Sequence, residues 1–435
     1  MFRKLIVLLA VPAIVGAQQT ATDTAFHQIS LADALRLAHD NNVQNVTSDN
    51  AIRTANNSLR SARAELYPSL SASASQSKSY GDRLGQSNNL VPIVPKWGYN
   101  TGLSSQFTLF DGGKSFADVR TQKANVAAAT ANEVNTEFSV ALNVKQAYNA
   151  VLAAKESETA AQAQLVTAQL QLQTSIAKVN AGAANVSDSL RSVVQVGNAQ
   201  LAVLTAQNTF RTQSATLTRL VGTPYFVTAQ LADTVDHTEV AVDSAGIMQM
   251  ALNGPTIRSA EAAATAAQAS ERAAKTAYFP TVSANLTFGG SGTSAIYGLN
   301  GNPFPYSRGM SVSMSYPIFN RFQRENQVSA AQIQFDNAQA QARDARLAAQ
   351  QNVITGIAAL RNAEETMRVQ AQNVAASEED LRVVQQRYAL GASVLLDVLT
   401  SQQTLITAQQ QLIQARLNYR NARAQIEAAI GHDLP

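Results

Sequence analysis

The chain has 435 residues, enough for two or three ordinary domains, but only 6% of them are aromatic and 14% are charged. A formal net charge of +3, without a cluster of lysines and arginines, argues against a nucleic-acid partner. The absence of cysteine excludes disulfides, thiolate metal sites, cysteine nucleophiles and a lipid-modified N-terminal cysteine. Lipid anchoring by other means stays open. The abundance of Ala and Gln in the middle of the chain favours long, closely packed helices.

Residues 1–17 have the pattern of a secretory signal peptide. Arg3 and Lys4 form a basic start, residues 5–15 are apolar, and small residues precede an expected cut after Ala17. The apolar run is too short to span a bilayer as a helix. We therefore expect an exported chain, and no later segment has 18 consecutive apolar residues.

Residues 18–222 predict a helix, a β-hairpin, a very long helix and a shorter return helix. The first helix is expected from an N-cap at Ser30 to residue 66, before a Tyr-Pro pair. Alternation of polar and apolar residues predicts a hairpin over 69–110. The stretch 114–179 contains no proline or glycine, which predicts a helix of about 100 Å. A turn at Gly182 leads into the return helix, which a Gly-Thr-Pro sequence ends.

Residues 223–243 are mixed in character and predict a small connecting subdomain. Residues 244–435 then repeat the order of the first half, with an interrupted helix, a hairpin over 281–319, a long helix and a return helix. The halves match without a gap at an offset of 209 residues, as between Gly182 and Gly391. Such a repeat indicates that helix length itself is constrained, as in a rod that spans a fixed distance.

The four predicted strands carry small polar residues on one face and Leu, Val, Met or Phe on the other. Each has about 10 residues, which suits a tilted strand that crosses a bilayer. A soluble β-sandwich alternates as well, but an isolated hairpin is marginally stable in water. Aromatic residues gather at the strand ends, as at a membrane interface: Tyr67, Trp97, Tyr99, Phe110, Phe279, Tyr316 and Phe319. Four strands cannot close a barrel, so the chain is expected to assemble.

Several motifs support a family assignment. They are Tyr67-Pro68 with the strand after it, the Leu-Phe-Asp-Gly-Gly sequence at 109–113, Gly182 with Asp188, and 387–393 followed by Asp397. On these motifs the chain resembles the outer-membrane efflux protein family of TolC-like channels over essentially its whole mature length. The resemblance implies an α+β membrane protein made of two tandem repeats. Its homotrimer would have a twelve-stranded transmembrane β-barrel, four strands per chain, and a long antiparallel coiled-coil helical barrel. The connector at 223–243 would lie in an equatorial belt.

The resemblance also implies a function. The chain would be the outer-membrane exit duct of a tripartite efflux or type I secretion system in a Gram-negative type of envelope, with a long periplasmic part. It would conduct passively and contact outer-membrane lipid, a periplasmic membrane-fusion adaptor, and an inner-membrane transporter of the RND, ABC or MFS type. No catalytic, cofactor or metal site is expected, and the four histidines lie far apart in sequence. A periplasmic or surface coiled-coil scaffold without a pore is the alternative, which leaves the strands unexplained.

Two functional regions follow from the resemblance, both at the hairpin tips. Adaptor docking is predicted for Lys178, Gly182, Arg387, Leu390 and Gly391. Turn geometry alone would also explain the two glycines.

The periplasmic gate is predicted at Asp188, Asp397, Tyr388, Ser393 and Thr400. Each aspartate could equally be one that the helix dipole favours in a first turn. The best-known relative has an arginine at the position of Ser393 and a second ring aspartate at that of Thr400. We therefore expect a weaker lock and one carboxylate ring where that relative has two.

Overall fold

The computed structural model describes residues 26–78, 80–84, 90–92, 97–230, 244–293 and 305–434. The chain divides into two compact units, which we call the hairpin unit and the sheet unit. The hairpin unit comprises Met1–Asn42, Asn143–His237 and Met367–Leu417, and the sheet unit comprises Val43–Leu142, Thr238–Thr366 and Asn418–Pro435. The predicted signal peptide and most of the predicted connector lie outside the described residues.

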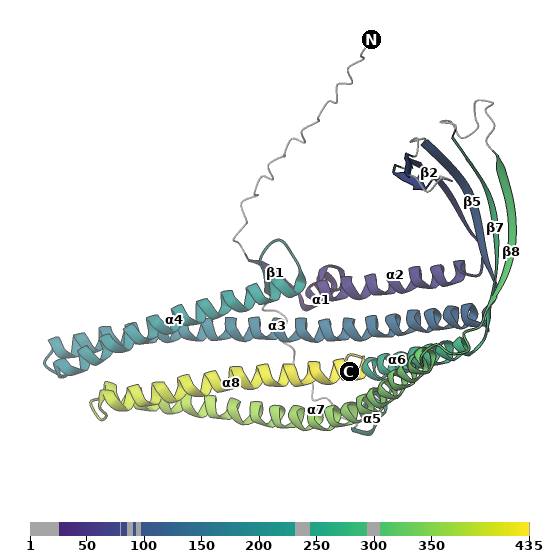
Figure 1. Ribbon diagram of the computed structural model, residues 1–435. Coiled ribbons are helices and arrows are strands. Elements are labelled where there is room, and N and C mark those ends of the chain that lie inside the picture. The colour runs from purple at the N-terminus through teal and green to yellow at the C-terminus, as the bar shows by residue number, and fades with distance from the viewer. Residues whose placement is uncertain are drawn as a thin grey trace, which may run out of the picture. The chain divides into compact units, whose positions relative to one another are not determined.

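Helices make up most of the described chain (Figure 1). They are α1 (Leu31–Asn41), α2 (Val43–Ala64), α3 (Lys114–Asn180), α4 (Val186–Val221), α5 (Ser244–Ala251), α6 (Pro255–Lys275), α7 (Gln323–Ala389) and α8 (Leu395–Ile430), with the short 3-10 helix η2 (Thr276–Tyr278) after α6. The predicted long helices are confirmed, since α3 and α7 each have 67 residues. The return helices α4 and α8 each have 36 residues. None of the described helices is apolar over a stretch long enough to cross a membrane.

The first predicted helix is divided in two, so the prediction of one helix over 30–66 was wrong. Ser30 is the expected N-cap, and its hydroxyl accepts a hydrogen bond from Asp33 N at 3.1 Å. The backbone of Asn42 is extended, with ψ of 131°, and ends α1. Its side-chain amide donates to Leu220 O of α4 at 2.8 Å. This tertiary contact, 178 residues away in sequence, accompanies the break, and a local pattern could not reveal it.

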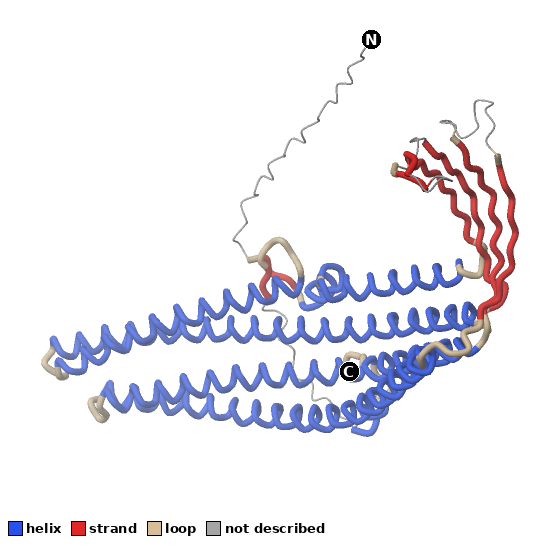
Figure 2. The backbone as a smooth tube through the Cα atoms, viewed as in Figure 1, coloured by secondary structure: helices blue, strands red, loops and turns tan. Residues whose placement is uncertain are grey.

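The membrane-length strands form one antiparallel sheet (Figure 2). Its order is β2 (Ser69–Lys78), β5 (Trp97–Phe110), β7 (Thr281–Gly292) and β8 (Tyr306–Ser315). The pairing of β5 with β7 joins the two predicted hairpins. Short strands also pair in parallel as β1 (His27–Ile29) with β6 (Val227–Ala229), and antiparallel as β3 (Asp82–Leu84) with β4 (Leu90–Pro92).

The register of the sheet gives it two chemically different faces. Leu103 lies opposite Ala72 on one side and Phe288 on the other, so the apolar residues of three strands share a face. A bulge between Thr108 and Phe110 shifts the pattern and places Phe110 opposite Val282. The alternation that predicted the hairpin over 69–110 is therefore interrupted at the end of β5.

Each unit has its own buried residues. In the sheet unit, α5, α7 and α8 enclose a cluster formed by Ile247, Ala251, Val353, Ile357, Leu360, Ala363, Tyr419, Ala422, Ile426, Ile430 and Leu434. In the hairpin unit, the buried Tyr148 of α3 donates from its hydroxyl to Ile29 O at 3.1 Å and accepts from Gln230 N at 3.1 Å. These hydrogen bonds hold the β1–β6 pair against α3.

The turn from β5 into α3 depends on two glycines with different surroundings. Gly112 and Gly113 both have positive φ, 69° and 84°. A Cβ at Gly112 would overlap the Phe279 side chain, whereas a Cβ at Gly113 would meet nothing within 4 Å. The Asp111 carboxylate accepts from Gly113 N at 3.0 Å and Ser115 N at 2.8 Å, which fixes the start of the helix.

We expect Gly112→Ala to destabilise the protein clearly more than Gly113→Ala. Both substitutions carry the cost of about 1–2 kcal/mol for an L-residue in the left-handed region. Only Gly112→Ala adds the overlap with Phe279. Thermal unfolding of both variants measures the difference, and equal losses would show that the approach to Phe279 is unimportant.

Candidate functional site

The two helical hairpins of the hairpin unit end in turns of the same type. In the first, Gly182 N donates to Val179 O at 3.0 Å and Ala183 N donates to Lys178 O at 2.8 Å. In the second, the corresponding bonds run from Gly391 N to Tyr388 O at 3.2 Å and from Ala392 N to Arg387 O at 2.8 Å. This pair of bonds is the Schellman motif, which requires a left-handed residue after the helix.

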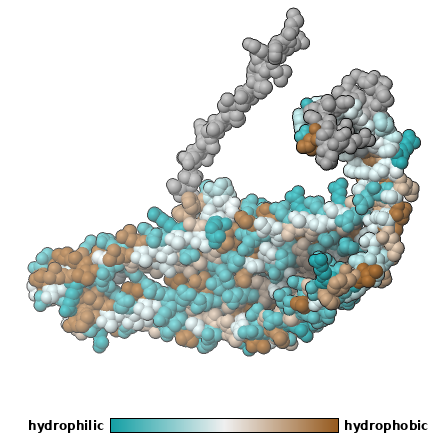
Figure 3. Space-filling view, in the orientation of Figure 1, coloured by the Kyte–Doolittle hydropathy of each residue, from teal (hydrophilic) through white to brown (hydrophobic). Residues whose placement is uncertain are grey.

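The turn glycines themselves are open to solvent. Gly182 and Gly391 have φ of 73° and 78°, and an added Cβ would meet nothing within 4 Å at either position. The neighbouring Leu390 is 85% exposed. Apolar residues gather around these tips, as Figure 3 shows. The exposed apolar side chains near the turns are Val186, Leu190, Val193, Val194, Leu390, Val394 and Leu396.

A contact between Lys178 and Tyr388 links the two hairpins. Lys178 Nζ donates to Tyr388 O at 2.8 Å and lies 3.7 Å from the centroid of the Tyr388 ring. The first hairpin thus holds the last turn of α7 by a charge-assisted hydrogen bond and a cation–π contact. Arg387, at the matching position of the second hairpin, is exposed. The two cations that the sequence predicts in one docking role therefore have different surroundings.

Buried polar groups surround Tyr388. Its hydroxyl is buried, and no group among the described residues lies in hydrogen-bonding geometry to it. The nearby Ser175 hydroxyl is engaged with Ser192 at 3.0 Å, and both serines are fully buried between α3 and α4. Burial raises the pKa of Tyr388, the Ser175 hydroxyl acts in the opposite sense, and the charge of Asp188 raises that pKa again. Tyr388, Asp188 and Lys178 thus belong to one polar cluster.

The other predicted gate residues make local contacts. The exposed Asp397 carboxylate accepts from the Ser393 hydroxyl at 2.7 Å and from Val394 N at 3.3 Å, which caps the start of α8. The Thr400 hydroxyl donates to Leu396 O of its own helix at 2.9 Å. In this structure, therefore, these three residues have helix-capping and backbone contacts. Their role in a gate stays a prediction.

Sequence reasoning missed the polar side chains that hold each hairpin together. Besides Ser175 and Ser192, the Ser401 hydroxyl of α8 donates to the Asp380 carboxylate of α7 at 2.7 Å. The available signal was a serine at heptad spacing from small apolar residues, as Ser175 is from Ala161 and Ala168. It is weak, because serine is equally common on exposed helix faces.

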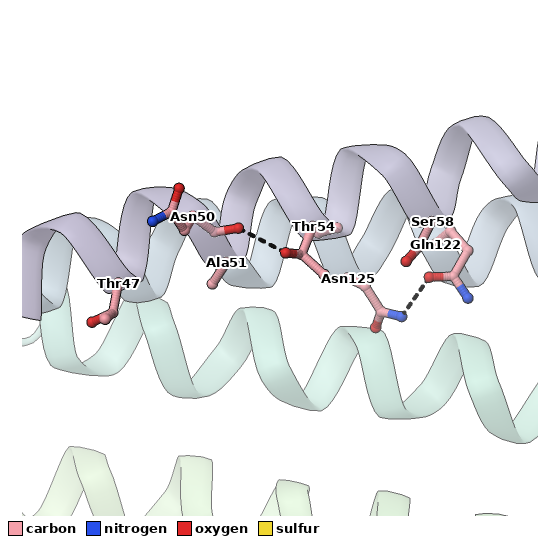
Figure 4. A pocket seen from close by; sticks show the side chains of 8 residues that line it. Thr47, Asn50, Ala51, Thr54, Ser58, Gln122 and Asn125 are labelled. Atoms are coloured by element: carbon pink, nitrogen blue, oxygen red, sulfur yellow. Dashed lines mark hydrogen bonds between the residues drawn. The ribbon is translucent and has the colours of Figure 1, made fainter. Parts of the chain in front are cut away.

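The sheet unit contains a groove of about 530 Å³ along α2 and α3 (Figure 4). Its lining is uncharged and consists of Thr47, Asn50, Ala51, Thr54, Ala55, Ser58, Gln122 and Asn125. Within it, Thr54 donates to Asn50 O at 2.9 Å and Asn125 donates to the Gln122 side chain at 3.1 Å. The groove has no titratable group and offers no acid–base chemistry. Within the described residues there is also no cluster of three histidines or carboxylates that could hold a metal ion.

Comparison with known proteins identifies the family. The model for "Outer membrane efflux protein" matches residues 20–223 and 246–432. The chain belongs to the outer membrane efflux protein family. The resemblance noted in the sequence is thereby confirmed, together with the outer-membrane location.

Relatives in this family are named for efflux and export. The probable efflux pump outer membrane protein TtgC of Pseudomonas putida is 25% identical over 384 residues, which cover 86% of this chain and 76% of that protein. The pyoverdine export outer membrane protein OpmQ of Pseudomonas aeruginosa is 26% identical and is matched over 68% of its length. The solvent efflux pump outer membrane protein SrpC of Pseudomonas putida is 32% identical over 180 residues, 41% of this chain. The matched part spans 38% of the length of SrpC.

Solved channel proteins share the fold. CusC superposes with a TM-score of 0.79 at 20% identity, over 94% of both chains. The open state of the MtrE outer membrane channel of Neisseria gonorrhoeae gives 0.74 at 21% identity, over 99% of both chains. These likenesses extend over nearly the whole chain and concern the fold alone.

We expect Lys178→Met to raise the resting conductance of the channel, because it removes the contact that links the hairpins. Loss of a cation–π contact and a charge-assisted hydrogen bond should shift the equilibrium between joined and separated hairpin tips about tenfold toward the separated state. Arg387→Met is the matched control, since it removes a cation four residues before the other glycine. Tyr388→Phe keeps the ring and the carbonyl that Lys178 contacts, so this variant should keep the resting conductance of the wild type. Planar-bilayer recordings measure all three, and equal conductance in Lys178→Met and wild type would contradict the role of Lys178.

Proposed function

We propose that the chain forms a passive exit duct for efflux across the outer membrane. The duct is a homotrimer, and each chain consists of two tandem repeats, at 18–222 and 244–435. The observation that carries this proposal is the two-faced four-stranded sheet. Its apolar face includes Leu70, Leu103, Leu286, Met310 and Val312, all of them exposed in the single chain. Strands of about 10 residues with such a face have the length and pattern of transmembrane β-barrels.

The opposite face of the sheet is polar and carries no charge in the described strands. It consists of Ser69, Ser71, Ser73, Ser75, Ser77, Gly98, Asn100, Gly102, Ser104, Gln106, Thr108, Thr281, Ser283, Asn285, Thr287, Gly289, Ser291, Ser307, Gly309, Ser311, Ser313 and Ser315. Hydroxyls bond across strands, as between Ser71 and Ser104 at 2.7 Å and between Ser283 and Ser313 at 3.1 Å. A wall of this kind suits a water-filled lumen without strong charge selection.

The edges of the sheet support closure by further copies. Among the described strands β2 and β8 each have one paired neighbour, so each leaves one side unpaired. They run in opposite directions, because three antiparallel pairings separate them. Pairing β8 of one copy with β2 of the next therefore continues an antiparallel sheet. Three copies give twelve strands, and closure removes the edges that lipid does not tolerate.

The helices also have surface that a neighbouring copy would cover. Exposed apolar residues follow α4 at intervals of three, four or seven, as in a coiled-coil seam: Val186, Leu190, Val194, Leu201 and Leu204. Gly197 lies within the same seam and has open space where a side chain would be. A helix of another subunit could approach closely at this point.

The partners and cargo follow from relatives and from the chemistry of the wall. We propose a membrane-fusion adaptor at the hairpin tips and an inner-membrane efflux transporter beyond it. The relatives are named for solvent, toluene, antibiotic and pyoverdine transport, which favours small organic molecules over secreted proteins. The alternative, a coiled-coil scaffold, would leave the exposed apolar face of the sheet in water. Extraction distinguishes the two, since a scaffold is released by salt and a barrel only by detergent.

We expect Gln106→Glu to make the channel more selective for cations. Gln106 lies on the polar face of β5, so the change places one carboxylate per subunit in the proposed lumen without altering side-chain shape. Gln76→Glu is the matched control, because Gln76 pairs with Tyr99 on the apolar face. Reversal potentials in a salt gradient measure the effect. The same shift in both variants, or in neither, would contradict the assignment of the lumen.

We expect Gly391→Trp to abolish export while trimers still form, because the indole would cover the exposed turn that the adaptor must contact. Gly391→Asn is the control, since asparagine tolerates the left-handed conformation and adds little volume. Dye accumulation in cells and native gels of the purified protein give the two readouts. Normal export by Gly391→Trp would remove the docking role of this tip.

A further inference from the structure

Lys78 lies on the apolar face of the sheet, at the end of β2 that is remote from the helices. It pairs with Trp97 across the strands. Its ammonium lies 5.3 Å from the centroid of the Tyr80 ring and 5.5 Å from that of the Trp97 ring. A lysine between two aromatic rings at the end of a lipid-facing strand has the environment of a membrane interface.

Arg308 lies on the same face of the sheet, in β8. Its guanidinium is 5.6 Å from the centroid of Phe288, which is its cross-strand partner. Phe288 in turn stacks on Tyr306, with ring centroids 5.4 Å apart and planes 3° from parallel. The exposed Arg308 thus lies beside a flat aromatic surface.

Neither cation has a carboxylate partner among the residues that the structure describes. The contacts of Lys78 and Arg308 are those with the aromatic rings. The sequence offers few candidates either, because segments 78–97 and 293–308 together contain four basic residues and the single acid Asp82. The sequence of this end of the sheet therefore has an excess of three basic residues over acidic ones.

We propose that the clusters Lys78–Tyr80–Trp97 and Arg308–Phe288–Tyr306 bind the phosphate groups of anionic lipid in the outer leaflet. The proposal rests on the barrel of the proposed function, which turns the apolar face toward lipid. In the proposed duct the helices lie in the periplasm, so the strand ends remote from the helices lie on the outer side of the membrane. There the aromatic rings occupy the interface, and the cations extend to the phosphate layer. Arginine matches phosphate oxygens with two parallel N–H groups, and lysine supplies a point charge.

Trp97 provides a direct test, because it is the only tryptophan of the chain. The full-length protein is reconstituted in phosphatidylcholine vesicles that contain a small fraction of brominated phosphatidic acid, or the same fraction of brominated phosphatidylcholine. Quenching of Trp97 by the two lipids is then compared. We expect the anionic lipid to be enriched about fivefold around Trp97. An enrichment of this size corresponds to the attraction between one basic residue and an anionic surface. A quenching ratio of one in the wild type would overturn the proposal.

Variants locate the site. Lys78→Gln should bring the quenching ratio close to one, whereas Lys123→Gln, which removes an exposed lysine of α3, should leave it unchanged. Phosphatidic acid retained by the purified protein, counted by native mass spectrometry, should fall in Arg308→Gln and fall further in the double variant. Unchanged quenching in Lys78→Gln, or unchanged retention in Arg308→Gln, would overturn the corresponding cluster. Displacement of the lipid by millimolar inorganic phosphate would instead identify a site for free phosphate and contradict a lipid site.

Conductance of the same preparations separates this proposal from the proposed function. A protein that conducts but shows no lipid preference would refute the phosphate site and leave the duct intact. A protein that is extracted by salt and does not conduct would refute the duct, whatever its lipid preference.

Discussion

A backbone N–H or C=O group without a partner costs several kcal/mol in the hydrocarbon of a membrane, and the four-stranded sheet has such groups along β2 and β8. Other features of the structure depend on this need to pair the edge strands. In the proposed barrel, a sheet that closes with further copies needs strands of equal reach, opposite faces of opposite polarity, and helices that begin at the same height in every subunit. The pairing of β5 with β7 satisfies the inner edges within one chain and leaves only the outer two for assembly.

Polar groups have different structural roles in the two units. In the sheet unit, serines and threonines line one face and bond between strands, which satisfies hydroxyls without placing charge on the proposed pore wall. In the hairpin unit, a few buried polar contacts hold helices that have few large side chains, and the link between Lys178 and Tyr388 joins the two tips.

Much of this could be predicted from particular residues. The absence of glycine and proline predicted α3, Ser30 predicted the start of α1, and the Gly-Thr-Pro sequence that begins at Gly222 predicted the end of α4. The break at Asn42 could not be predicted, because its partner is the carbonyl of Leu220, far away in sequence. The bulge near Phe110 was equally hidden, since an extra residue in a strand leaves the composition unchanged. At the tips, the sequence identified Lys178 but not its contact.

The sequence by itself determined the periodicities, and with them the long helices, the strands and their two faces, because these depend on neighbours a few residues apart. Its motifs also determined the family. Only the tertiary structure decided that the two hairpins form one sheet, and that Lys178 is held by Tyr388 while Arg387 is exposed. Such choices depend on distances between segments about 200 residues apart, which local patterns do not encode.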